Sequence, residues 1–149
     1  MNNVKRTKSH SMKGFTLIEI IVVVVIIGLL AAVIAPNIFG QVEEARIKKS
    51  LSDLRAIESA LNLYRLDNFN YPTTEQGLQA LVTKPSGSPE AKNWRKGGYI
   101  PRMPLDPWGM EYQYANPGTS GDFDLFTFGA DGKVGGEENN KDLSTADLR

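Results

Sequence analysis

The sequence predicts an α+β protein in which one long N-terminal helix packs against a small antiparallel sheet. An apolar stretch passes directly into an amphipathic one, and together, over residues 15–67, they favour a single long helix. Five prolines within residues 85–107 exclude long regular structure from that stretch. Residues 111–115 and 122–128 are rich in aromatic side chains and flank a turn-rich segment, which indicates a pair of antiparallel strands.

The apolar stretch covers residues 15–39 and contains no charge between Ile20 and Ala35. It is long enough to cross a bilayer, which takes about 20 helical residues. Residues 1–14 carry four Lys or Arg and no Asp or Glu, so the positive-inside rule places them in the cytoplasm. A secretory signal peptide is the alternative. Its usual core of roughly 7 to 15 residues is shorter, and an acid near its start is unusual.

Glu19 is the one acid in the apolar stretch, and an intramembrane carboxylate costs about 2.5–3.5 kcal/mol on insertion scales. It needs a cationic partner, but no Lys or Arg lies between Phe15 and Gln41. Cleavage between Gly14 and Phe15 would create an amino group on Phe15, one helical turn from Glu19. We therefore expect Glu19 to pair with this group, on its own chain or on a neighbouring copy. The alternative is an interfacial acid that snorkels to the surface.

The amphipathic stretch carries apolar side chains at steps of three and four over residues 47–64, which predicts one buried helix face. Further on, Thr73 and Gln76 have capping-box spacing ahead of Leu78, which predicts a short second helix. Several charged side chains are expected on a solvated face, with contacts between subunits as the alternative. These are Asp53, Arg55 and Glu58 on the helix and Arg102 in the loop.

Composition limits the classes of function. Of 17 Lys and Arg, four lie in residues 1–14, which leaves 13 cations against 17 acids in the rest and gives no support for nucleic-acid binding. Cysteine is absent and the single histidine is His10, so disulfides and thiolate metal sites are excluded. A membrane-anchored periplasmic enzyme remains an alternative, although the sequence has neither a phosphate loop nor a nucleophile elbow.

The segment from Asp131 to Asp142 is the candidate ligand site. Its first, sixth and twelfth positions match an EF-hand loop, but Lys133 and Gly135 occupy positions where that loop needs side-chain oxygens. Calcium takes six to eight oxygens, and backbone carbonyls can supply several of them. A calcium site is therefore possible here without an EF-hand, and a solvated acidic turn is the alternative.

The segment Gly14-Phe15-Thr16-Leu17-Ile18-Glu19 resembles the class III leader and cleavage site of type IV pilins and type II secretion pseudopilins. Further segments resemble the major pseudopilins of type II secretion systems, the general secretion pathway protein G family. These segments are Tyr71–Leu78, Gly97–Ile100, Pro104–Gly109 and Phe128–Gly132. A type IV pilin for adhesion or motility is the alternative, and the absence of a cysteine pair for the usual C-terminal disulfide disfavours it.

The resemblance implies a type IV pilin-like fold with three parts. Residues 1–14 are a cytoplasmic leader that prepilin peptidase removes between Gly14 and Phe15, with N-methylation of Phe15. Residues 15–39 form a transmembrane and filament-core helix in which Glu19 guides assembly, and residues 40–149 form a periplasmic domain. Translation would start at Met1 or at Met12.

The implied function is that of the major, non-enzymatic subunit of a helical filament that drives export of folded proteins across the outer membrane. The implied location is the inner membrane of a Gram-negative cell, crossed once, before assembly. Implied partners are further copies of the chain, minor pseudopilins, membrane lipid, prepilin peptidase, an inner-membrane assembly platform and its cytoplasmic ATPase.

The resemblance also implies a calcium site in the C-terminal loop. Its ligands would be the carbonyls of Phe128 and Lys133 and the carboxylates of Asp131 and Asp142. Glu137 and Glu138 are weaker candidates. After Leu143 the chain departs from the family, which commonly continues with Gly-Asn-Trp where this sequence has Ser-Thr-Ala.

Overall fold

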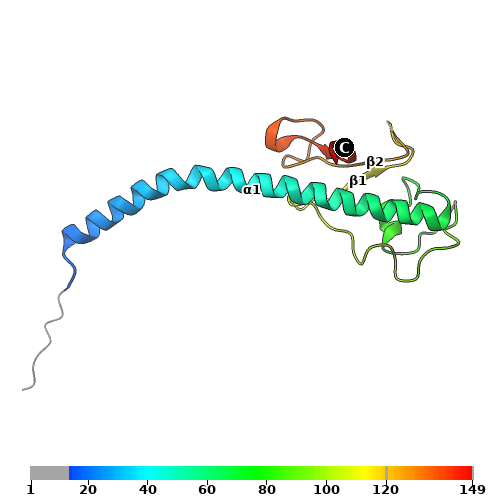
Figure 1. Cartoon of the computed structure of the whole chain (residues 1–149), viewed down its shortest axis with the longest axis horizontal. Coiled ribbons are helices and arrows are strands. Elements are labelled where there is room, and N and C mark those ends of the chain that lie inside the picture. Colours follow the sequence, from blue (N-terminus) through cyan, green and yellow to red (C-terminus); the bar gives the residue numbers. More distant parts are fainter. Residues whose placement is uncertain (1–13, 120, 149) are drawn as a thin grey trace, which may run out of the picture. The chain divides into compact units, whose positions relative to one another are not determined.

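The computed structural model describes residues 14–119 and 121–148, and its longest element is a single helix. This helix, α1, runs from Leu17 to Asn68 (Figure 1). The predicted helix over residues 15–67 is therefore confirmed to within two residues at each end. The chain divides into two compact units, Met1–Gly40 and Gln41–Arg149.

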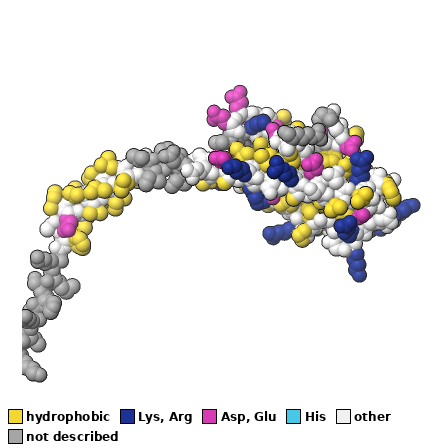
Figure 2. Space-filling model, in the orientation of Figure 1, with side chains coloured by type: hydrophobic (Ala, Val, Ile, Leu, Met, Phe, Trp, Pro, Cys, Tyr) yellow, Lys and Arg dark blue, Asp and Glu magenta, His cyan; other side chains and the backbone are white. Residues whose placement is uncertain are grey.

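In the first unit, the described residues form the N-terminal part of α1, and their apolar side chains are exposed. Leu17 is 79% exposed and Leu29 is 66% exposed. Figure 2 shows hydrophobic side chains along this segment with one acidic side chain near its start. The side chains of residues 33–39 lie outside the description. Among the described residues, no helix combines the length and hydropathy of a membrane-spanning segment.

In the second unit, one face of α1 forms the centre of the core. Leu54, Ile57, Leu61 and Tyr64 recur at steps of three and four, and each is at most 1% exposed. This spacing aligns their side chains on one side of the helix. The predicted apolar face is thus confirmed.

A three-stranded antiparallel sheet packs on this helix, with the order β1-β2-β3. The strands are β1 (Gln113–Ala115), β2 (Asp124–Thr127) and β3 (Leu143–Ser144). The predicted strand pair is confirmed as β1 and β2, although both strands are shorter than expected. β3 was not expected, because a strand of two residues has too little periodicity to detect.

Thr73 and Gln76 form the predicted capping box, in which each backbone N–H donates to the other side chain at 3.1 Å. A short 3-10 helix, Leu78–Leu81, comes next in the chain. The second helix therefore exists as a single turn, whose Leu78 and Leu81 enter the core. Two further 3-10 helices lie near the C-terminus, at Glu138–Asn140 and Thr145–Leu148.

Residues 82–108 contain no helix or strand, as the prolines predict, and join the core through specific bonds. Trp94 Nε1 donates to the carbonyl of Ala80 at 2.9 Å, and the N–H of Tyr99 donates to the carbonyl of Leu81 at 2.7 Å. In the view of Figure 1, this loop lies below the second half of α1 and the strands lie above it.

Candidate functional site

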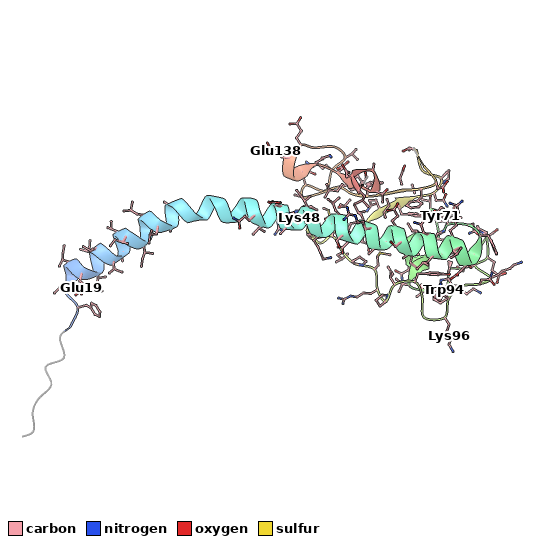
Figure 3. The ribbon with its side chains drawn as sticks, in the orientation of Figure 1. Glu19, Lys48, Tyr71, Trp94, Lys96 and Glu138 are labelled. Atoms are coloured by element: carbon pink, nitrogen blue, oxygen red, sulfur yellow. The ribbon has the colours of Figure 1, made fainter. Side chains whose placement is uncertain are left out.

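The residues of the predicted cleavage site stand at the start of α1. Gly14, Phe15 and Thr16 precede the helix and are exposed, and Glu19 lies in its first turn. The N–H of Glu19 donates to Thr16 Oγ1 at 3.3 Å, and the N–H of Thr16 makes a longer contact of 3.5 Å with Glu19 Oε2. These reciprocal contacts form a capping box, which partners backbone donors that a helix start leaves unpaired. Figure 3 shows Glu19 at this end of the ribbon.

The structure therefore places Glu19 against Thr16 in its own first turn. The expected pairing with the amino group of Phe15 arises only after cleavage, and residues 1–13 lie outside the described part of the chain. That pairing stays a prediction. Sequence reasoning missed the capping box, although Thr16 and Glu19 have the spacing that defines one.

Strands β2 and β3 bring the two ends of the C-terminal loop together. Thr127 at the end of β2 lies opposite Leu143 at the start of β3. Phe128, which follows β2, and Asp142, which precedes β3, are therefore next to this pair. Both residues line one cleft of about 480 Å³. A Cβ placed on Gly129 would lie 2.8 Å from the carbonyl oxygen of Lys141, so the two ends of the loop approach closely. Two of the residues predicted as calcium ligands are thus neighbours.

Asp142 has one partnered and one unpartnered oxygen. Its Oδ2 accepts the N–H of Gly135 at 2.9 Å. Its Oδ1 is buried and has no hydrogen-bond partner among the described residues. A buried carboxylate oxygen without a donor is costly unless a cation or a proton meets it. This oxygen is the feature of the loop that favours a bound cation.

The other predicted ligands lie along the same loop. Oδ1 of Asp131 accepts the N–H of Lys133 at 3.0 Å, and both residues are exposed. Glu137 and Glu138 are also exposed, and Figure 3 shows Glu138 projecting away from the ribbon. The structure therefore leaves the two weaker candidates at the surface.

The donors in this loop fit calcium by their chemistry, because calcium binds carboxylate and carbonyl oxygens in flexible arrangements. Within the described ranges, no three His, Cys, Asp or Glu side chains gather in a way that would hold a metal ion. The calcium ligands expected in this loop include the backbone carbonyls of Phe128 and Lys133 beside the carboxylates of Asp131 and Asp142.

One predicted surface charge is placed differently. Asp53 is not on a solvated face, because its side chain is only 14% exposed. It accepts a hydrogen bond of 3.0 Å from the Tyr112 hydroxyl and pairs with Lys49 Nζ at 2.5 Å. Arg55 and Arg102 are exposed, as expected, and Glu58 is partly buried. The carboxylate of Asp53 is thus paired with side chains of its own chain.

Two family models match the chain. The model for type II secretion system protein G matches residues 37–146, and the model for the prokaryotic N-terminal methylation motif matches residues 9–35. The chain belongs to the type II secretion system protein G family. The resemblance in the leader motif and in the downstream segments is thereby confirmed.

Relatives of this family cover nearly the whole chain. The type II secretion system core protein G of Pseudomonas aeruginosa is 54% identical over 134 residues, which are 90% of this chain and 94% of that protein. The core protein G of Vibrio cholerae serotype O1 is 51% identical over 142 residues, 95% of this chain and 97% of that protein.

A solved structure confirms the fold. The crystal structure of the major pseudopilin from the type 2 secretion system of enterohaemorrhagic Escherichia coli matches with a TM-score of 0.64 and 51% identity. The match covers 73% of this chain and 93% of that chain. A long helix with a small antiparallel sheet is therefore the architecture that this chain shares with that major pseudopilin.

Proposed function

We propose that this chain is the major structural subunit of a type II secretion pseudopilus and not an enzyme. The observation that carries the proposal is the exposed apolar surface at the start of α1 in a member of the protein G family. Large exposed apolar surfaces mark sites of association with protein or membrane. Packing of several such helices in a filament core would bury these side chains, and the charged outer domain would face water.

Before assembly, residues 15–39 would cross the inner membrane of a Gram-negative cell, and residues 40–149 would lie in the periplasm. The cationic residues 1–14 would remain in the cytoplasm under the positive-inside rule. An assembly platform with its cytoplasmic ATPase would add subunits to a short periplasmic filament that also contains minor pseudopilins.

Processing by prepilin peptidase would cut between Gly14 and Phe15 and methylate the new amino group. The match to the N-terminal methylation motif and the exposed, non-helical Gly14 and Phe15 support this assignment. Mass spectrometry of the protein extracted from membranes should find an N-terminus at methylated Phe15. Cleavage after Ala35 would instead identify residues 1–35 as an ordinary signal peptide.

A secretion assay tests the filament function directly. In a strain that lacks the gene, the wild-type chain should restore secretion of folded periplasmic proteins and periplasmic cross-links between copies. Glu19→Gln should be present in the membrane at the wild-type amount. It should form few cross-links, because the variant lacks the negative charge with which Glu19 would guide assembly. Full secretion and cross-linking by this variant would contradict the role of Glu19. Restored surface motility in place of secretion would indicate a type IV pilin.

Calcium would bind in the C-terminal loop through the carboxylates of Asp131 and Asp142 and the carbonyls of Phe128 and Lys133. The unpartnered, buried Oδ1 of Asp142 supports this set. The ion would neutralise that carboxylate and hold the two ends of the loop. Because calcium would bind only the native loop, saturation at about 100 times the Kd would add about 2.7 kcal/mol to the free energy of unfolding.

Calorimetry of the full-length chain in detergent, with calcium chloride or with a chelator, tests this site. We expect a higher Tm with calcium for the wild type and no calcium effect for Asp142→Asn. Glu75→Gln is the matched control, since it removes one exposed negative charge from outside the loop. An equal Tm of the wild type with calcium and with chelator would contradict the calcium site.

A further inference from the structure

A buried hydrogen bond sets the orientation of the peptide unit between Phe128 and Gly129. The N–H of Gly129 donates to Oγ1 of Thr127 at 3.3 Å, and this bond is buried. A trans peptide is planar, so its N–H and C=O point in opposite directions. Because this bond holds the N–H of Gly129 toward Thr127, the carbonyl of Phe128 points away from Thr127.

Thr127 is itself held by a buried carboxylate. Its hydroxyl donates to Oδ2 of Asp106 at 2.5 Å, and Thr127 is 0% and Asp106 4% exposed. A hydroxyl has one proton and two lone pairs, and an ionised carboxylate can only accept. With its proton directed at Asp106, Thr127 Oγ1 can only accept from Gly129. The acid thus determines the direction of the bond that orients the peptide.

Asp106 is also fixed. Its Oδ1 accepts the N–H groups of Trp108 at 3.1 Å and of Met110 at 2.8 Å, so both carboxylate oxygens are used within the domain. The sulfur of Met110 lies 2.9 Å from the position that a Cβ on Gly132 would take. The turn over residues 106–110 therefore supports the C-terminal loop at two points, one through Thr127 and one through Met110.

We propose that Thr127, held by Asp106, is a positioning residue that aims the carbonyl of Phe128 as a calcium ligand. This inference rests on the calcium site proposed above and adds two residues that would not touch the ion. Outer-shell partners of this kind contribute about 10- to 100-fold to metal affinity.

The test measures the Kd for calcium of the full-length chain in detergent, by isothermal titration with calcium chloride. Thr127→Val keeps the shape of the side chain but removes both bonds, and we expect its Kd to rise by about 10- to 100-fold. Thr127→Ser keeps the hydroxyl and should bind within about threefold of the wild type. An unchanged Kd for Thr127→Val, or an equal loss for Thr127→Ser, would overturn the positioning role.

Thr74→Val is the matched control. Thr74 Oγ1 also donates to one group and accepts from another, the carbonyl and the N–H of Asn116, at 3.0 and 2.9 Å. It is not in the C-terminal loop, so this variant should keep the wild-type Kd whatever its effect on Tm. A Kd that rises equally for Thr74→Val and Thr127→Val would show a general effect of stability and overturn the inference.

Amide hydrogen exchange of the wild type gives a second test that does not depend on a variant folding. With chelator present, the amide of Gly129 should remain protected, because Thr127 holds it without calcium. Protection that arises only when calcium is added would overturn the inference. A wild type that binds no calcium at all would overturn the calcium site together with this inference. A wild type that binds calcium, together with an unchanged Kd for Thr127→Val, would overturn only the positioning role of Thr127.

Discussion

The hydroxyl of Tyr112 lies 3.0 Å from Oδ2 of Asp53, and this hydrogen bond joins the chain just before β1 to the middle of α1. Tyr112 is 5% exposed. Burial first, and then the negative charge of Asp53, raises the pKa of the Tyr112 hydroxyl well above its ordinary value. Folding thus favours the neutral hydroxyl of Tyr112 over the tyrosinate.

This raised pKa predicts a loss of stability at alkaline pH. Above the ordinary tyrosine pKa of about 10, the unfolded chain releases this proton while the folded chain still holds it. The free energy of unfolding therefore falls as the pH rises past that value. In urea titrations of the protein in detergent, Tyr112→Phe should show a shallower fall over roughly pH 10–12, the range just above the ordinary pKa. Identical slopes for variant and wild type would exclude Tyr112 as a source of the effect.

Asn68 should be the most sensitive polar position at the end of α1. It is 7% exposed, donates to the Tyr64 carbonyl at 3.1 Å and the Tyr99 hydroxyl at 2.9 Å, and accepts the N–H of Asn93 at 3.2 Å. We expect Asn68→Ala to cost about 3 kcal/mol, because buried partners lose their bonds. Asn62→Ala, at an exposed position of the same helix, should cost less than about 1 kcal/mol in the same urea titration. Equal losses would contradict this account.

Gly97 and Gly98 both have positive φ, +100° and +82°, but only Gly98 is crowded. A Cβ on Gly98 would lie 2.9 Å from the carbonyl oxygen of Leu81 and 3.0 Å from that of Val82, whereas a Cβ on Gly97 would meet nothing within 4 Å. Both alanine variants should lose about 1–2 kcal/mol to backbone strain. Gly98→Ala should lose more, seen as a lower Tm than that of Gly97→Ala. A matching Tm for the two variants would argue that the loop adapts.

Thr16 should stabilise the first turn of α1 through its capping box with Glu19. Replacing an N-cap threonine by a residue without a hydroxyl costs about 1 kcal/mol, or roughly a fivefold change in an equilibrium constant. In detergent, Thr16→Val should therefore speed amide exchange over residues 18–20 by about fivefold. Thr16→Ser keeps the hydroxyl and should exchange like the wild type. Faster exchange in the serine variant as well would point to a cause other than capping.

Most of the secondary structure was predictable because its signals are local. The apolar spacing of Leu54, Ile57 and Leu61 specifies the buried helix face, and the prolines of residues 85–107 exclude regular structure. The short second helix was predicted from the capping box of Thr73 and Gln76, which specifies where a helix starts and not how far it continues; the structure has one 3-10 turn there. The strand β3 went unpredicted because two residues pair only where β2 offers an edge.

The candidate sites were predictable in part. The cost of an acid among apolar residues is enough to single out Glu19 from the order of residues alone. The family resemblance already ranked Asp142 above Glu137 and Glu138 as a ligand, and the fold adds a physical difference between them. Asp142 directly precedes β3 and is partly buried, whereas both glutamates are exposed on the loop.

The sequence alone determined the leader motif, the apolar helix and the family, because each depends on residue types at short, fixed spacings. The tertiary structure decided which polar groups meet: Tyr112 with Asp53, 59 residues apart, and Thr127 with Asp106, 21 residues apart. Such pairs follow from packing of the sheet and loops on α1, and no local pattern encodes them. The physical reason is that a buried hydroxyl or carboxylate must find a partner wherever the folded chain supplies one.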